Sequence, residues 1–182
     1  MVKSRVDVRA LQRPLRERYE REPSAAQIVL RVRSGQSDLA DPLHCAVETE
    51  GANVTVRSGA HPLVGGDGDV ACSGDLLLAA LAACQETTLR MVAANMGIDV
   101  TSLEVTATAD WDARGTLAMP GAPIGLRNIR CHTKVVVAED ERGERAARLL
   151  RSAEKYCVIL NTLRDGTSVE STFELASARS GA

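Results

Sequence analysis

Aromatic side chains are scarce in this chain of 182 residues: they make up 2% of it, with one Trp, two Tyr and one Phe. A surface that stacks nucleic-acid bases or sugar rings needs several aromatic side chains, so the sequence argues against both kinds of binding. The net charge is −2 and no basic stripe is present, so nucleic acid is not an expected partner. The core has to be built instead from Leu, Val, Ile and Ala.

Long apolar runs are also missing. The longest has nine residues, whereas a membrane span needs about 20. The N-terminus, MVKSRVDVRALQRPLRERYERE, is charged throughout and lacks the apolar segment of a signal peptide. We therefore expect no membrane partner and a cytoplasmic location.

Paired cysteines and glycine-rich nucleotide loops are absent as well. The odd number of cysteines and the lack of a CxxC argue against a disulfide framework in a reducing cytosol. The three histidines are far apart, which disfavours a closed zinc site, and no GxGxxG or P-loop occurs. We expect neither a metal nor a cofactor. The cysteines are Cys45, Cys72, Cys84, Cys131 and Cys157.

The stretch that begins at Ser73, SGDLLLAALAACQETTLRMVAANMG, predicts a long helix. Asp75 supplies a favourable charge in the first turn, and Gly97 is a typical helix terminator. From Leu76 to Cys84 no side chain is polar apart from the thiol at the end. A helix without a polar face must be surrounded by protein, so we place this helix at the centre of the fold.

The other elements predict an α+β protein. Hairpin-like neighbours and segregated helices favour a mostly antiparallel sheet packed on the buried central helix. The expected elements are a helix over residues 4–22 interrupted by Pro14, strands over 25–33, 43–49, 54–58, 100–111, 126–138 and 167–175, a helix over 139–156, and a short helix after Cys157.

We expect three parts in the chain: an N-terminal helical arm (1–24), one α+β domain (25–176) and a disordered tail (177–182). One sheet and one further long helix barely suffice to cover an apolar helix on all sides. A second copy would supply the missing cover, so we expect an intertwined homodimer that packs two central helices between two sheets.

Two cysteine motifs resemble those of a known family. LLAALAACQETTL (77–89) is similar to the buried helix of OsmC/Ohr thiol peroxidases, and EKYCVILNTL (154–163) is similar to their second cysteine motif. The resemblance covers Ala25 to Leu175 and implies the OsmC-like fold. It implies a peroxidatic Cys84 and a resolving Cys157, with an organic hydroperoxide as substrate and an external dithiol as reductant.

The resemblance also implies groups that stabilise the Cys84 thiolate, which lies too far along its own helix to benefit from that helix's N-terminus. The family pairs an Arg on an early strand with a Glu at the start of the central helix. The matching residues are Arg31, with Arg33 as a second candidate, and Asp75, which would serve the partner subunit because it lies about 180° round the helix from Cys84. The alternatives are a solvated sheet face for the arginines and a helix-start charge for Asp75.

The chain departs from the family pattern in several ways. The proline common before the central helix is absent, Asp75 replaces a longer Glu, Val158 stands where Pro usually follows the second cysteine, and Cys72 is an extra thiol. Since a fold does not fix a function, two alternatives stay open. One is a non-catalytic protein that binds a small ligand on the same scaffold, and the other is a subunit that supports a larger assembly through its N-terminal arm.

Overall fold

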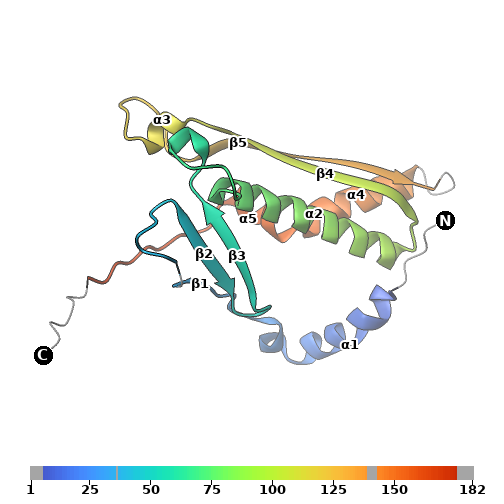
Figure 1. Cartoon of the computed structure of the whole chain (residues 1–182). Helices are drawn as coiled ribbons and strands as arrows, with labels where there is room; N and C mark the ends of the chain where they lie inside the picture. The colour runs from blue at the N-terminus through green and yellow to red at the C-terminus, as the bar shows by residue number, and fades with distance from the viewer. Residues whose placement is uncertain (1–5, 36, 139–142, 176–182) are drawn as a thin grey trace, which may run out of the picture.

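A long helix beneath a long hairpin forms the centre of the molecule (Figure 1). The computed structural model describes residues 6–35, 37–138 and 143–175. The central part consists of α2 (Ser73–Met96), β4 (Val100–Trp111), β5 (Leu126–Val137), α4 (Glu144–Tyr156) and α5 (Val158–Asp165). The peripheral part consists of α1 (Val8–Arg21), η1 (Pro23–Ala26), β1 (Val32–Ser34), β2 (His44–Thr49), β3 (Val54–Gly59), η2 (Pro62–Val64) and α3 (Ala113–Thr116).

Both sheets are antiparallel, which confirms the predicted α+β class. One sheet has the order β1-β2-β3 and the other pairs β4 with β5. The predicted hairpin over 43–58 is present: Thr49 pairs with Val54, and Asn53 closes the turn with a φ of 51°. The strand over 100–111 has the predicted bounds, and β5 ends one residue before the predicted end.

Local hydrogen bonds define both ends of α2. At its start, the Asp75 carboxylate accepts a hydrogen bond of 3.0 Å from the Cys72 N–H. At its end, Gly97 adopts the left-handed conformation with a φ of 66°, and the Ile98 N–H donates to the carbonyl of Ala93 over 2.9 Å. This arrangement is a Schellman motif, and it turns the chain directly into β4. The end of the helix at Gly97 is as predicted, and the helix begins at Ser73 with Cys72 as its N-cap rather than Ser73 itself.

The core lies between α2, α4 and the inner face of the hairpin. Its members are apolar side chains spaced one turn apart on each helix or two residues apart on each strand. The fully or almost fully buried members are Leu89, Ala93, Ile98, Leu149 and Ala153, with Val92, Met96, Val100, Leu103, Val135 and Val137 packed around them. This core covers one side of α2.

The prediction that Leu76 to Cys84 is buried on all sides is wrong for the single chain. Within that run only Leu81 is buried, and Leu77 is 38% exposed. The reason is geometric, because the hairpin and α4 cover only one side of the helix.

By length and composition alone α2 could also cross a membrane, but a core helix of a water-soluble protein meets the same criterion.

Two predicted strands are also corrected. Of the strand expected over 25–33, only Val32 and Arg33 pair with β2, and the observed strand continues to Ser34. Val32 pairs with Thr49, the last residue of β2, so the residues before Val32 have no residue of β2 opposite them. Ile28, Val29 and Leu30 are strongly exposed as a result. The segment 167–175 is not assigned as a strand either, and its Phe173 is 96% exposed. Among the described residues neither segment has a neighbouring strand over its full length.

The N-terminal arm is helical over Val8–Arg21, and Pro14 lies within the helix without interrupting it. The arm contacts the end of α2: Arg9 Nε donates to the carbonyl of Asn95 over 2.6 Å, and the Asn95 amide donates to Gln12 over 2.9 Å. The tail 177–182 and the first residues of the helix expected over 139–156 lie outside the described residues.

His44, on β2, joins the three-stranded sheet to the loop that leads into α2. Its Nδ1 lies 2.8 Å from Asp41 and its Nε2 lies 3.0 Å from Asp69, while Arg57 lies 3.8 Å from the same Asp69 carboxylate. The hydrogen bonds to Asp41 and Asp69 raise the pKa of His44, since both carboxylates favour the imidazolium form. The Ser58 hydroxyl, which donates to the Ala71 carbonyl over 3.0 Å, joins the same two segments.

Replacing His44 with Gln is expected to change the pH dependence of stability. The charged interaction is fully present below the unfolded-state pKa of about 6.5 and is lost as the pH rises through the higher folded-state value. The wild type should therefore exceed His44→Gln in melting temperature by more at about pH 5.5 than at about pH 9. Thermal unfolding followed by circular dichroism checks this, and a difference that does not vary with pH would contradict it.

Candidate functional site

The structure brings Cys84 and Cys157 together. Cys84 lies in the middle of α2 and is half-buried, while Cys157 is fully buried at the junction between α4 and α5. Both are free thiols, and the Cys157 side chain is one of the groups that lower the pKa of Cys84. The two cysteines thus interact without forming a disulfide.

Four hydrogen-bond donors surround the Cys84 sulfur. Two are the backbone N–H groups of Val158 and Ile159 in the first turn of α5. The other two are the Cys157 thiol and the hydroxyl of Thr88, which lies one turn further along α2. Burial raises the pKa of Cys84, but these donors outweigh burial, so its pKa lies below that of an ordinary cysteine. The helix N-terminus that stabilises this thiol belongs to α5 and not to α2.

Cys157 has the opposite electrostatic environment. Burial raises its pKa to about 11, and the neighbouring Cys84 and Cys131 add to the rise. Cys157 therefore keeps its proton at neutral pH. The pair divides into one thiol whose pKa is lowered and one whose pKa is raised.

Asn161 holds the junction that positions Cys157. Its side-chain amide donates to the carbonyls of Cys157 at 2.7 Å and Lys155 at 3.1 Å, with a longer contact of 3.4 Å to that of Glu154. The Glu154 and Lys155 carbonyls belong to the last turn of α4, whose final acceptors have no partner within that helix, while the Cys157 carbonyl also accepts from the Asn161 N–H over 3.1 Å. An ion pair of 2.7 Å between Arg164 and Glu154 joins the same two helices. Asn161 is not among the site residues predicted from the sequence, where only its place as a polar residue after the apolar Val158-Ile159-Leu160 points to a structural role.

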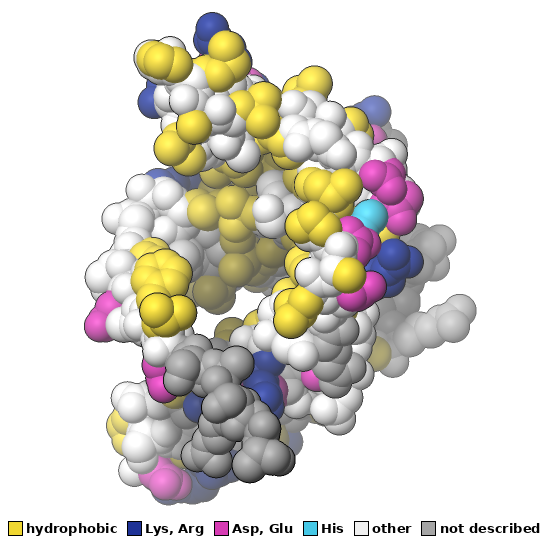
Figure 2. Space-filling view, turned by 60° about the vertical axis from the view of Figure 1, so that its left-hand side comes forward, with side chains coloured by type: hydrophobic (Ala, Val, Ile, Leu, Met, Phe, Trp, Pro, Cys, Tyr) yellow, Lys and Arg dark blue, Asp and Glu magenta, His cyan; other side chains and the backbone are white. Residues whose placement is uncertain are grey.

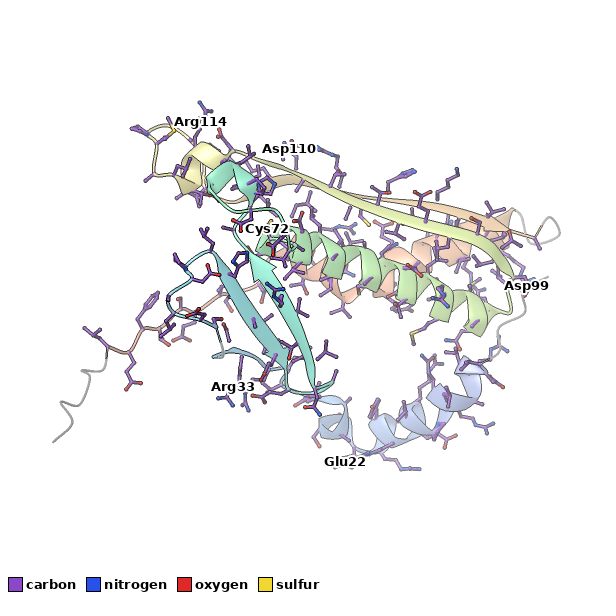
Figure 3. The ribbon with its side chains drawn as sticks, viewed as in Figure 1. Glu22, Arg33, Cys72, Asp99, Asp110 and Arg114 are labelled. Atoms are coloured by element: carbon purple, nitrogen blue, oxygen red, sulfur yellow. The ribbon has the colours of Figure 1, made fainter. Side chains whose placement is uncertain are left out.

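The other predicted site residues do not reach the two thiols within one chain. Arg31 is 66% exposed and pairs with Glu50 at 3.5 Å, and Arg33 lies on β1, well away from Cys72 at the start of α2 (Figure 3). Asp75 caps the start of α2, about 13 Å along the helix axis from Cys84. Their proposed roles at a thiol site stay predictions.

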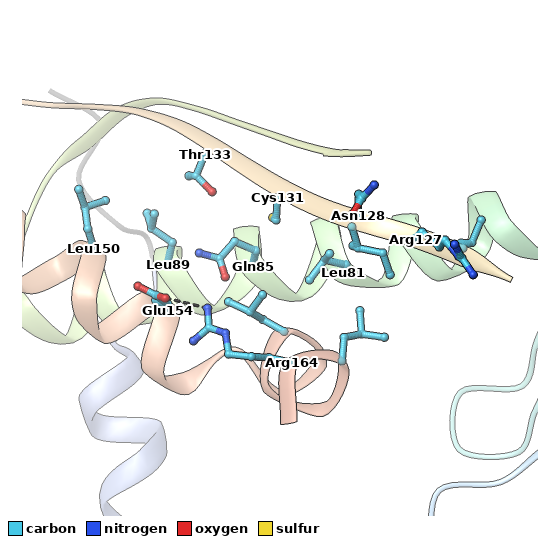
Figure 4. A pocket seen from close by; sticks show the side chains of 14 residues that line it. Leu81, Gln85, Leu89, Arg127, Asn128, Cys131, Thr133, Leu150, Glu154 and Arg164 are labelled. Atoms are coloured by element: carbon cyan, nitrogen blue, oxygen red, sulfur yellow. Dashed lines mark hydrogen bonds and ion pairs between the residues drawn. The ribbon is translucent and has the colours of Figure 1, made fainter. Parts of the chain in front are cut away.

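A groove of about 700 Å³ lies between β5, α2 and the two C-terminal helices (Figure 4). Gln85 of α2 and Cys131 of β5 face it, and Leu81, Leu150 and Leu163 form part of its apolar wall. The Gln85 side chain is buried, and among the described residues its oxygen has no hydrogen-bond partner. Neither Cys84 nor Cys157 lines this groove, although Gln85 follows Cys84 directly on α2.

Two further observations concern residues that could bind a ligand. The ring of His61 packs edge-on against Trp111, with centroids 5.3 Å apart, so both side chains have a structural role. Within residues 6–35, 37–138 and 143–175, no group of three or more His, Cys, Asp or Glu side chains is placed to hold a metal ion.

The stretch of the chain that holds both cysteines matches a known family. A sequence profile described as OsmC-like protein matches residues 66–172, more than half of the chain. The chain belongs to the OsmC-like protein family. The profile includes the whole of α2, the β4–β5 hairpin and the α4–α5 junction.

Solved structures of OsmC-like proteins share the fold at low identity. An OsmC-like protein from Mycoplasma pneumoniae is 17% identical with a TM-score of 0.59, covering 76% of this chain and 89% of its own. An organic hydroperoxide resistance protein OsmC from Legionella pneumophila is 20% identical with a TM-score of 0.55, covering 75% and 90%. An organic hydroperoxide resistance protein from Elizabethkingia anophelis is 18% identical with a TM-score of 0.55, covering 76% and 89%. No curated protein sequence matches the chain significantly.

In this OsmC-like chain, Asn161→Ala is expected to destabilise the protein by about 1–3 kcal/mol, because the carbonyls at the α4–α5 junction lose their donor. Asn161→Asp has nearly the same size but presents acceptors to those carbonyls, so it should cost at least as much. Urea unfolding of both variants checks this. If Asn161→Asp were as stable as the wild type, the side chain would only fill space.

Proposed function

We propose that this OsmC-like protein is a thiol-dependent peroxidase that reduces organic hydroperoxides. One observation carries the proposal: the Cys84 sulfur accepts hydrogen bonds from the first turn of α5 and from the Cys157 thiol. A thiolate is the form of cysteine that attacks peroxides, and these donors favour it. The likeness in fold to two proteins described as organic hydroperoxide resistance proteins supports the substrate class.

The proposed reaction has two steps in the protein. The Cys84 thiolate attacks one peroxide oxygen, the O–O bond breaks, and the products are a Cys84 sulfenic acid and an alkoxide that takes a proton to become the alcohol. The Cys157 sulfur then attacks the Cys84 sulfur, forming a disulfide and releasing water that carries the Cys157 proton. An external dithiol reduces the disulfide and restores both thiols. The apolar run that precedes Cys84 on α2, from Leu76 to Ala83, favours a hydrophobic peroxide.

We further propose that the working unit is a homodimer, because one chain leaves apolar surface of α2 uncovered. Leu77 and Met91 are 38% and 40% exposed, and only 22% of the most apolar 18-residue window of α2 is buried. Figure 2 shows hydrophobic side chains gathered around a hollow on one face of the chain. A second copy that packs its own α2 here would remove this apolar surface from water.

Two extended segments support an exchange of strands in that dimer. The segments 27–31 and 167–175 have the alternation of strands, yet neither has a partner strand in the part of the chain that the structure describes. Their apolar side chains are among the most exposed in the molecule, with Phe173 at 96% and Leu175 at 100%. In a dimer of this kind Arg31 and Asp75 would approach the partner's thiol pair. The cytoplasmic location and the dithiol reductant stay predictions.

A second candidate function is the binding of a small ligand without turnover. The observation that favours it is the buried Gln85 oxygen, which faces the groove without a hydrogen-bond donor. A ligand with an apolar body and one N–H or O–H group would fit the leucine wall and satisfy this acceptor. If Cys84 and Cys157 stay unmodified after treatment with a hydroperoxide, the result would favour ligand binding over peroxidase activity.

Treatment with one equivalent of cumene hydroperoxide is expected to convert the protein stoichiometrically into a form with a Cys84–Cys157 disulfide. Mass spectrometry of the digested protein detects the linked peptides. Cys84→Ser should lose the product entirely, while the control Cys45→Ser, at an exposed thiol remote from the pair in sequence, should retain it. Unmodified thiols in the wild type would refute the peroxidase function.

The dimer is tested by mass in solution. Light scattering at micromolar concentration should give twice the chain mass for the wild type and a lower average mass for Leu77→Arg, because a charge on the apolar face of α2 would be buried without a partner. Thr106→Arg, on the exposed face of β4, is the matched control and should remain dimeric. A monomeric wild type would contradict the proposal.

A further inference from the structure

The apolar side of α1 has little cover. Leu11, Leu15 and Tyr19 lie one turn apart along one side of this helix, here called the arm stripe, and are 62%, 44% and 36% exposed. Two hydrogen bonds with Asn95 hold α1 to α2, so its attachment to its own chain is polar. The hollow between α1 and Asn95 is lined mainly by charged side chains, and no residue of the arm stripe lines it.

A helix of this kind needs packing on its apolar side. α1 has 14 residues, includes Pro14 and buries none of its side chains. Helices of roughly this length are marginal in water by themselves, and most helices in proteins are stabilised by packing an apolar face. A proline inside a helix increases this need, because it removes a backbone hydrogen bond. We therefore expect the arm stripe to be the surface that stabilises α1.

The single chain also exposes far more surface than a compact protein of its size. Its accessible surface is 14061 Å², whereas a compact monomer of 19.4 kDa exposes about 8,500 Å². The excess amounts to several thousand Å², and permanent interfaces between proteins bury roughly 2,000–5,000 Å². The missing cover is therefore as large as a protein surface, and a second copy in the proposed homodimer would supply it.

One segment of a second copy fits the arm stripe in polarity and length. In the segment 167–175, the strongly exposed Val169, Phe173 and Leu175 lie on one face, because they alternate with other residues of an extended chain. From Val169 to Leu175 such a chain spans about 20 Å. The 14 residues of α1 span about 21 Å, so the two apolar surfaces match in length.

The two surfaces also have opposite charge. α1 contains five arginines and two glutamates, hence a net charge of +3, while the segment 167–175 contains Glu170 and Glu174 and no basic residue, hence −2. Opposite charges favour the approach of two surfaces. Within one chain α1 and this segment lie apart, on opposite sides of β2 and β3 in Figure 1. Contact between them therefore requires a second copy.

We propose that α1 of one chain packs its arm stripe on the apolar face of the segment 167–175 of a second copy. The inference rests on the proposed homodimer, whose two-fold symmetry would form this contact twice. The edges of the segment stay available for pairing with a strand, because only its face is used. The matched family profile begins at residue 66, so α1 lies outside the part of the chain that defines the family.

Photo-crosslinking of the full chain tests this contact. The photoreactive residue p-benzoylphenylalanine takes the place of Tyr19, an aromatic residue of the arm stripe. Ultraviolet light should then give a product of two chains on a denaturing gel. Mass spectrometry should find position 19 linked to the tryptic peptide that contains Phe173. The matched control carries the same group in place of the exposed Glu17, about 200° round the helix from Tyr19, and should give little of this product.

A change on the other surface should weaken the same contact. Phe173→Ser, in the chain that carries the photoreactive group at position 19, is expected to lower the yield of the linked peptide roughly fivefold or more, because apolar contact area is lost. Thr172→Ser, on the opposite face of the segment, should leave the yield unchanged. Both side chains are exposed in one chain, so neither change removes packing within it, and circular dichroism checks that both variants fold.

Three results would overturn the contact: a link within one chain, a link to another peptide, or equal yields from positions 17 and 19. Light scattering distinguishes the failure of this contact from the failure of the homodimer. Twice the chain mass without a link between position 19 and the Phe173 peptide would refute only the contact of α1. A monomeric wild type would refute both proposals.

Discussion

The contact between the start of α5 and the middle of α2 is the interaction on which the candidate site depends. It places unused backbone donors and the Cys157 thiol at the Cys84 sulfur, although the two motifs are far apart in the chain. The contact is maintained from both sides. On one side, the core of Leu89, Ala93, Leu149 and Ala153 holds α4 against α2. On the other, Asn161 and the Arg164–Glu154 pair fix the angle at which α5 leaves α4.

This arrangement separates the properties of two thiols that are in contact. Cys84 is half-buried and receives four donors, so its thiolate is favoured despite partial desolvation. Cys157 is fully buried, and its pKa is raised. Two groups whose environments shift their pKa values in opposite directions are typical of sites with a division of chemical roles. In the proposed peroxidase the first thiol attacks and the second waits until a sulfenic acid has formed next to it.

The second constraint is the incomplete cover of α2. The hairpin and α4 bury one side of this helix. Apolar surface that none of the described residues covers lies at Leu77, at Met91 and on the segments 27–31 and 167–175. This incomplete cover within one chain is the common cause of three wrong predictions: the strands over 25–33 and 167–175, and the full burial of Leu76 to Cys84. The alternating patterns are real, but a strand needs a neighbour, and an apolar helix needs packing on each face. All three corrections are consistent with the proposed homodimer.

The sequence alone determined the features that depend on nearby residues. Asp75 and Gly97 predicted the ends of α2, alternation predicted the bounds of β4 and β5, and the two cysteine motifs predicted the family. Tertiary structure alone decided which groups meet. Caps and periodicity involve residues a few positions apart, whereas the donors to Cys84 come from a helix that begins at Val158 and reaches the sulfur only through packing. For the same reason no side-chain pattern reveals that the peptide groups of Ile159 and Val158 lower the pKa of Cys84.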